Sequence, residues 1–169
     1  MRVTTLVLSC HSSDPSSVVP MQSKRQFTKL KYAGLDETQP MASSGEHFVN
    51  ALVEGHKNGA TLVLGGRNYN VTKARSDEAM VNTPASAANV PLDLKWRPDE
   101  SDRENYRRIR NEMQQVYPRF FQVVGTELDE HIAVKLNKLD AYPNIVAVVM
   151  MLHVDGVEES LKSMGWKEG

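Results

Sequence analysis

An uninterrupted apolar run over residues 145–152 is the feature that most constrains how this chain can fold. The run is far shorter than the roughly 20 apolar residues that a membrane helix needs. A continuous run of this length suits a central strand that is covered on both faces. Apolar residues at helical spacing precede it over residues 127–140 and follow it in a short segment that closes at Gly165. A helix, a buried strand and a second helix in succession predict a sheet with helices on at least one face.

Four further segments have the composition of strands. Residues 2–9 are β-branched and apolar, and residues 27–32 combine apolar positions with the lysines that are typical of an edge strand. A helix is the alternative for residues 27–32. Residues 61–71 form two alternating runs around the pair Gly65-Gly66, which predicts a tight hairpin. Residues 90–96 are expected to form a short strand.

Three main helices are expected, over residues 44–57, 101–117 and 127–140. Each begins with a capping pattern, in which Ser or Thr is followed three residues later by an acidic residue, and continues with one apolar stripe. Pro118 should end the second helix just after Tyr117, because the residue before a proline avoids the helical conformation.

The expected fold class is α+β. A chain of 169 residues is long enough for one compact core and too short for two ordinary domains. We therefore predict a single domain over residues 1–169, with a mixed sheet of about four to five strands, the three main helices packed on it and a short C-terminal helix. Residues 76–100 interrupt the pattern, because they show little periodicity and contain three prolines. A long non-periodic segment inside a compact domain is usually a binding segment or a disordered one.

Composition excludes several classes of protein. The 20 basic and 21 acidic residues nearly cancel, so the chain lacks the overall positive field of a non-specific nucleic-acid binder. Its single cysteine excludes an internal disulfide and a framework of several cysteines around a metal. We predict no metal, no cofactor and no membrane association. The N-terminal apolar stretch is too short and too polar for a signal peptide, so a cytoplasmic location is expected.

Five residues form the candidate catalytic group: Cys10, His11, Asp14, His153 and Asp155. The first three follow the first predicted strand, and the last two follow the buried strand. If these strands are parallel, their carboxyl ends meet at one edge of the sheet, where ligands of α/β proteins bind. Thiol, imidazole and carboxylate groups could then act as nucleophile, base or metal ligands. The simpler interpretation, which we favour, is that the first loop is an ordinary turn, Asp155 a helix N-cap and His153 a residue at a strand end.

Four other residues are candidates for binding. Arg67 follows the glycine pair and could, with Asn68, bind an anion, although a hairpin turn accounts for this segment better. Arg107 and Arg108 lie on the second predicted helix, where interleaved acidic residues favour solvated helix pairs over a phosphate-binding stripe, so nucleic acid is a secondary possibility. Trp96 could be an aromatic anchor for a protein partner.

Because no catalytic motif survives inspection, we expect a non-enzymatic binding or assembly protein that uses protein–protein contacts of its long loops. The partner would be another protein or a second copy of the chain. Proteins of this size without motifs are common among virus-encoded proteins, so a virion component or a host-interaction factor is the class we expect. The alternative is a small α/β enzyme or binder of a nucleotide or another phosphorylated ligand, at the ends of strands 2–9 and 145–152. Whether the chain is an enzyme stays open.

Overall fold

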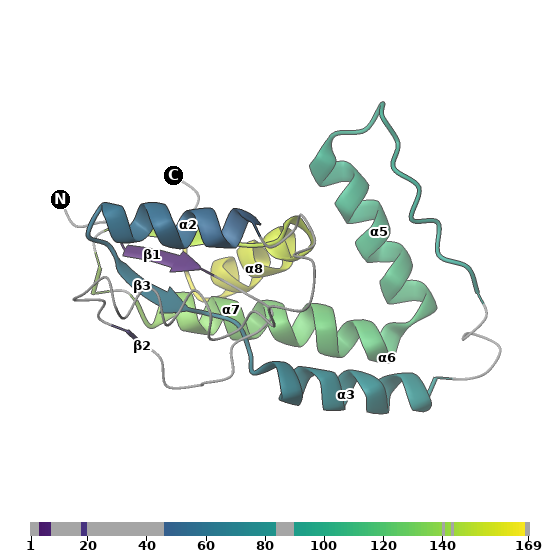
Figure 1. Ribbon diagram of the computed structural model, residues 1–169. Helices are drawn as coiled ribbons and strands as arrows, with labels where there is room; N and C mark the ends of the chain where they lie inside the picture. Colours follow the sequence, from purple (N-terminus) through teal and green to yellow (C-terminus); the bar gives the residue numbers. More distant parts are fainter. Residues whose placement is uncertain are drawn as a thin grey trace. The chain divides into compact units, whose positions relative to one another are not determined.

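The computed structural model is mostly helical (Figure 1). It describes residues 4–7, 18–19, 46–83, 90–139, 141–142 and 144–167. The contacts within the chain divide it into two compact units. Unit 1 comprises Met1–Tyr69 and Val134–Val149, and unit 2 comprises Asn70–Ala133 and Met150–Gly169. A division into two compact units is found in single domains and also in proteins with two domains. The single domain predicted over residues 1–169 therefore stays a prediction.

Unit 1 contains all the strands that the described residues form, and each is short. They are β1 (Thr4–Val7), β2 (Val18–Val19), β3 (Thr61–Leu64) and β4 (Ile145–Val148). The strands pair in the order β2-β3-β1-β4. Strand β1 is parallel to both β3 and β4, and β2 is antiparallel to β3. The backbone register places Val7 beside Leu64 and Val148, so the three parallel strands end at the same edge.

Helix α2 (Glu46–Lys57) packs against β1 and β3 within unit 1. It confirms the helix predicted over residues 44–57, whose expected cap, Ser43, lies outside the described residues. The chain leaves the helix through Gly59, which has a φ of 66°, a conformation that favours glycine. Buried Leu62 and Val63 of β3 then contribute to the core of this unit.

In the described part of unit 2, all regular secondary structure is helical. Its helical elements are α3 (Tyr69–Val81), α5 (Asp102–Val116), α6 (Pro118–Phe121), the π-helical turn η2 (Gln122–Thr126), α7 (Glu127–Asn137) and α8 (Met151–Ser163). The first residue of α3 and the last four residues of α7 belong to unit 1. Phe121, Val123, Leu128, Ile132 and Val157 are buried in its core. None of the helices in the described ranges is both long enough and apolar enough to cross a membrane.

The prediction for α5 is confirmed at both ends. Ser101 accepts a hydrogen bond from the backbone of Glu104, and the Glu104 side chain bonds back to Ser101, which completes the capping box. The helix ends at Val116, and Pro118 begins α6 after a break at Tyr117. The cap predicted at Thr126 is wrong, because Thr126 lies inside η2, where α6, η2 and α7 follow one another directly.

The predicted hairpin over residues 61–71 is also wrong. Its first half is strand β3, but its second half enters helix α3 at Tyr69. The periodicity of apolar residues did not predict helix α3, because the helix has no apolar stripe. Ala79 is the only described residue of α3 that is buried. Five alternating residues were too few to tell a strand from the first turn of such a helix.

The apolar run of residues 145–152 is divided between two elements. Strand β4 ends at Val148, and helix α8 begins at Met151. The strand is not covered on both faces as predicted: it lies at the end of the strand order, and Val146 is 46% exposed. Asp155 is therefore not an N-cap, because it lies within α8, whose N-cap is Met150.

The predicted fold class is wrong. We expected an α+β domain whose main layer is a mixed sheet of four to five strands, with the helices packed on it. Instead, helices dominate the described residues, strands are confined to unit 1, and none exceeds four residues. Two segments counted as strands are not strands: residues 67–71 enter α3, and residues 90–96 are extended without a strand partner in the described chain. The predicted edge strand at residues 27–32 lies outside the described residues.

Candidate functional site

An extended segment, residues 90–97, runs along helix α5 in unit 2, and we call it the strap (Figure 1). The side chain of Asn105, which is 0% exposed, holds its end. Asn105 Oδ1 accepts a hydrogen bond from Arg97 N at 2.8 Å, and Asn105 Nδ2 donates one to Arg97 O at 2.8 Å. One side-chain amide therefore satisfies both backbone polar groups of Arg97, as a neighbouring strand would.

Two charged side chains of α5 continue this ladder toward the start of the strap. Arg108 donates to Asp93 O at 3.1 Å and to Lys95 O at 2.6 Å. Glu112 accepts a hydrogen bond from Asp93 N at 2.5 Å. Because Asn105, Arg108 and Glu112 are three and four residues apart, they form one stripe on the helix. This stripe satisfies the backbone of alternate strap residues, so the strap is fixed without being part of a sheet.

Large apolar side chains of the strap remain exposed to solvent. Val90 is 41% exposed, Leu94 is 54% exposed and Trp96 is 48% exposed. They occupy even positions, whereas the odd positions 93, 95 and 97 carry charged residues. Trp96 is steadied by an edge-on contact with Tyr106, with ring centroids 5.5 Å apart. The result is an exposed apolar row, defined by Val90, Leu94 and Trp96, on a fixed backbone.

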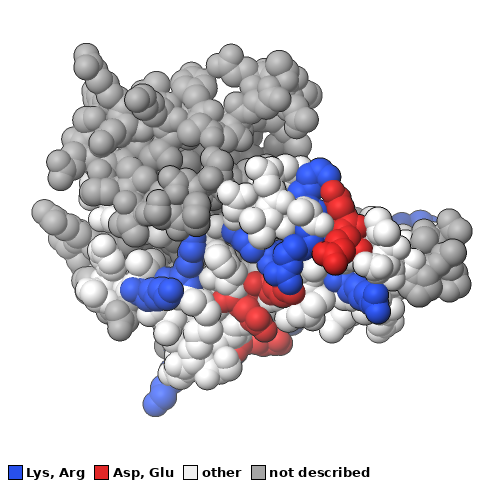
Figure 2. All heavy atoms as spheres, turned by 90° about the horizontal axis from the view of Figure 1, so that it is seen from below, with Lys and Arg blue, Asp and Glu red and all other residues white. Residues whose placement is uncertain are grey.

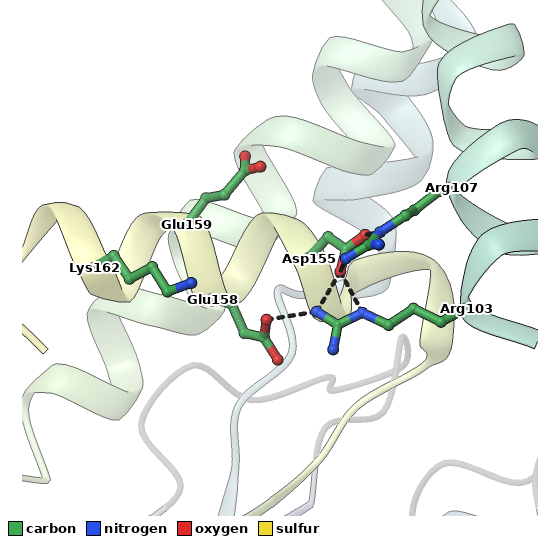
Figure 3. Close-up of a pocket in the computed structure, with 6 residues that line it drawn as sticks. All are labelled: Arg103, Arg107, Asp155, Glu158, Glu159 and Lys162. Atoms are coloured by element: carbon green, nitrogen blue, oxygen red, sulfur yellow. Dashed lines mark hydrogen bonds and ion pairs between the residues drawn. The ribbon is translucent and has the colours of Figure 1, made fainter. Parts of the chain in front are cut away.

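On another side of α5, an open hollow lies between α5 and α8 (Figure 3). The six residues that line it are all charged: Arg103, Arg107, Asp155, Glu158, Glu159 and Lys162. Figure 3 shows both arginines reaching from α5 toward Asp155 on α8. Arg107 Nε lies 2.5 Å from Asp155 Oδ2, and Arg103 Nη2 lies 2.5 Å from Glu158 Oε2. We call these four residues the outer network.

The pKa values of Arg103, Arg107 and Asp155 in the outer network are shifted away from neutrality. Hydrogen bonding from Arg107, with a smaller contribution from Arg103, lowers the pKa of the Asp155 carboxyl despite its partial burial. Hydrogen bonding to Asp155 raises the pKa of Arg107, and hydrogen bonding to Glu158 raises that of Arg103. These three groups therefore stay charged near pH 7, so they suit ion pairing and do not suit general acid–base catalysis.

A third polar cluster is buried between α5, α7 and α8, and we call it the inner cluster. Asp129, which is 1% exposed, lies at its centre. Asp129 Oδ1 lies 2.7 Å from His153 Nδ1, and Asp129 Oδ2 lies 2.7 Å from Arg110 Nη2. The second approach has ion-pair distance without hydrogen-bond geometry, so we treat it as an ion pair. Arg110 also donates to Leu152 O at 3.0 Å and lies over the Phe121 ring, 4.9 Å from its centroid.

Gly156 allows the helices to approach closely at the inner cluster. A Cβ atom at this position would overlap Asp129 Oδ2 and would lie 2.6 Å from Arg110 Nη2. Any side chain at position 156 would therefore displace the ion pair between Arg110 and Asp129. The contacts of the cluster join three helices through one carboxylate, so its role in the described structure is architectural.

The structure separates the predicted catalytic residues that it describes. His153 is buried against Asp129, whereas Asp155 meets Arg103 and Arg107 in the outer network. Both lie on helix α8, where residues two positions apart face different sides, in contrast to the shared side expected on a strand. Cys10, His11 and Asp14 lie outside the described residues.

The predicted binding residues are distributed over three places. Trp96 belongs to the apolar row of the strap, and Arg108 holds the strap on α5. Arg107 belongs to the outer network, and Arg67 is a half-buried residue in the connection between β3 and α3. The four arginines of α5 thus all contact other parts of unit 2, and basic and acidic groups lie side by side on the face drawn in Figure 2. The partners of these arginines are therefore groups of the chain itself, and nucleic acid stays a secondary prediction.

Sequence reasoning missed Asn105, Arg110, Glu112 and Asp129, which organise the strap and the inner cluster. Residues 90–96 were predicted to form a short strand, but the partner of this extended segment is helix α5. No comparable signal pointed to Asp129, whose burial depends on residues 19 and 24 positions away in the sequence.

Within the described ranges, no group of three or more His, Cys, Asp or Glu residues is placed to hold a metal ion. A scan against protein-family models finds no matching family. Searches of curated proteins and of solved structures find no match either. The functional argument therefore depends on the geometry alone.

Proposed function

We propose that this chain is a non-enzymatic binding or assembly protein that uses the apolar row of the strap to contact another protein chain. The observation that carries the proposal is the exposure of Val90, Leu94 and Trp96 on a backbone that α5 holds in place. Isolated exposed apolar residues need no explanation, but three large ones in seven residues form a patch of the kind that marks interaction sites.

The fixed backbone of the strap supports this proposal energetically. Binding by a loose loop is weakened because the loop loses conformational freedom when it becomes ordered. In the strap, Asn105, Arg108 and Glu112 have already ordered the backbone before any partner arrives. More of the energy from burying the apolar row is then available for association.

The chemistry of the row indicates the partner surface. Trp96 offers a large aromatic side chain, and Leu94 beside it offers an exposed aliphatic one. Aromatic residues in a small apolar patch often provide most of the energy of a protein interface. Charged Lys95 and Arg97 alternate with them and suit the polar rim of such an interface. A second copy of the chain is the first partner to test, because it needs no other component.

The test replaces Leu94 with glutamate and measures self-association by analytical ultracentrifugation between about 1 and 100 μM. We expect the wild type to associate and Leu94→Glu to weaken the association about tenfold or more, since a buried charge opposes the contact. Val81→Glu is the matched control, because Val81 is an apolar residue of the same unit that is 84% exposed and lies outside the strap.

The same three proteins are then used as baits in the cells that produce the chain, and captured proteins are compared by mass spectrometry. The proposal requires a partner that is held by the wild type and by Val81→Glu but lost by Leu94→Glu. If the wild type stays monomeric and Leu94→Glu captures the same proteins as Val81→Glu, the strap is not the binding surface and the proposal is wrong.

The expected viral origin depends on how common such proteins are among viruses, and no contact in the described chain adds to it. The enzymatic alternative keeps its five candidate residues as a hypothesis, although His153 and Asp155 serve different clusters.

A further inference from the structure

Lys135 of helix α7 lies at the end of strand β3, within unit 1. Its Nζ atom donates a hydrogen bond to Leu64 O at 3.3 Å. Partial burial lowers the pKa of this lysine, and the nearby charge of Lys138 lowers it further. Among the residues that the structure describes, no carboxylate lies at ion-pair distance from Lys135. A half-buried ammonium beside a neutral carbonyl keeps donors available for an anionic ligand.

The residues that follow β3 are suited to the same ligand. Leu64 is followed by Gly65 and Gly66, both buried, and then by Arg67. Glycine pairs allow a ligand oxygen to approach backbone N–H groups, because no side chain stands between them. The sequence pattern had assigned this segment to a hairpin, and its actual course from strand to helix removes that explanation for the glycines.

The position of this segment adds a third argument. Strands β1, β3 and β4 are parallel, and Val7, Leu64 and Val148 are paired at their carboxyl ends. The chain proceeds from β1 to β3 on one side and later to β4 on the other side. In parallel α/β arrangements, ligands bind outside the carboxyl ends of the strands. The residues that follow β3 lie at this edge, next to the end of β1, whereas the change of direction itself falls between β1 and β4.

We propose that unit 1 binds the phosphate group of a small soluble ligand at the carboxyl end of β3, with Lys135 as the principal cation. The backbone of Gly65 and Gly66 donates further hydrogen bonds, and Arg67 contributes a second positive charge. Phosphate fits better than a single carboxylate, because its several oxygens match a lysine, an arginine and backbone donors together. This site is separate from the strap, so either proposal can fail without the other.

The experiment measures binding of inorganic phosphate by isothermal titration calorimetry to the wild type, Lys135→Met and Lys138→Met. Methionine keeps the apolar stem of the lysine and removes only its charge. Lys138→Met is the matched control, since Lys138 is exposed and lies three residues away. We expect Lys135→Met to bind phosphate about tenfold more weakly or worse, because it loses a charge-assisted hydrogen bond. Lys138→Met should bind only slightly more weakly than the wild type, because the exposed charge of Lys138 is screened by solvent. Chloride at matched ionic strength controls for screening.

A second variant, Lys135→Arg, keeps the positive charge and should retain most of the binding, even if Lys135→Met does not fold. A nucleoside monophosphate, titrated in parallel, should bind more tightly than inorganic phosphate if the site takes a nucleotide and equally if it recognises phosphate alone. The proposal is overturned if the wild type does not bind phosphate, if both methionine variants lose binding equally, or if Lys135→Arg binds no phosphate while remaining folded.

Discussion

Helix α5 contacts its neighbours through two sets of ion pairs that use the same chemistry in different surroundings. In the inner cluster, Arg110 meets Asp129, whose side chain is 2% exposed. In the outer network, Arg103 and Arg107 meet Asp155, whose side chain is 19% exposed. Both sets pair an arginine of α5 with an aspartate on another helix of unit 2. The main difference between the two sets is the exposure of the aspartate to water.

This difference decides how much each set contributes to stability. A buried charge that loses its partner cannot be solvated, so breaking one side of a buried pair is costly. A half-exposed charge that loses its partner is taken up by water, and the measured contribution of such pairs is small. The number of ion pairs is therefore a poor guide here, and burial of the carboxylate is the better one.

The largest expected effect comes from Asp129→Asn, which removes the charge of the inner cluster and keeps the shape of the side chain. We expect a loss of about 3–5 kcal/mol in the free energy of unfolding, because Arg110, whose side chain is only 16% exposed, is left without a counter-charge. The measurement is equilibrium unfolding in urea, followed by circular dichroism. A protein that no longer shows a cooperative transition would meet the same expectation, because a loss of this size is a large part of the stability of an ordinary domain.

Asp155→Asn makes the same chemical change in the outer network and is the matched control. It should cost no more than about 1 kcal/mol in the free energy of unfolding. If the two substitutions destabilise the protein equally, burial does not separate the two sets of ion pairs and the comparison fails.

A smaller effect is expected from Asn105→Ala, which tests a buried polar group that carries no charge. The substitution leaves Arg97 N and Arg97 O without the partners that Asn105 provides. We expect a loss of about 1–3 kcal/mol in the free energy of unfolding. The strap should also become accessible to trypsin after Lys95 and Arg97, which limited proteolysis would detect.

Asn111→Ala is the control for this prediction, because Asn111 is an exposed residue of the same helix. It should leave both stability and cleavage of the strap nearly unchanged. Equal cleavage of the two variants would mean that Asn105 does not hold the strap. If Asn105→Ala destabilises the protein by an amount between those of Asp129→Asn and Asp155→Asn, the comparison becomes sharper. Such a result would distinguish the cost of losing a buried hydrogen bond from the cost of losing a buried charge pair.

The helices that could be predicted from the sequence are those with a local sequence pattern, such as an apolar stripe or a capping box. The apolar stripe of α2 and the capping box of α5 are each formed by residues that are close together in the sequence. Periodicity and capping patterns were therefore sufficient to predict these two helices. Helix α8 was predicted to start too late, because its N-cap is Met150, which has no side-chain oxygen to signal a helix start. Helix α3 was missed because it lacks a buried stripe.

The candidate sites were less predictable, since they depend on contacts between distant residues. The role of Trp96 as an exposed aromatic group could be suggested, but the side chains that hold the strap could not. Asn105, near the start of helix α5, resembles an ordinary solvated residue until the strap is placed beside it. Lys135 likewise acquires its position only when α7 meets the end of β3. Local patterns do not encode such pairings, because the paired residues are separated by other elements.

The smallest expected effect is the pH dependence that the outer network gives to stability. Arg107 and Arg103 lower the pKa of Asp155 in the folded protein, so the folded state favours the charged carboxylate more than the unfolded state does. The stabilisation is fully present above the unfolded pKa, about 3.9, and is lost as the pH falls through the folded value, which is lower. We therefore expect the Tm of the wild type to exceed that of Asp155→Asn at pH 6 by a small amount, and the difference to shrink as the pH falls below about 3.9. Scanning calorimetry from pH 2.5 to 7 measures it, with Asp99→Asn as an exposed control outside the helices. A difference that grows as the pH falls would have the wrong sign and would show that the arginines do not stabilise the charged form of Asp155.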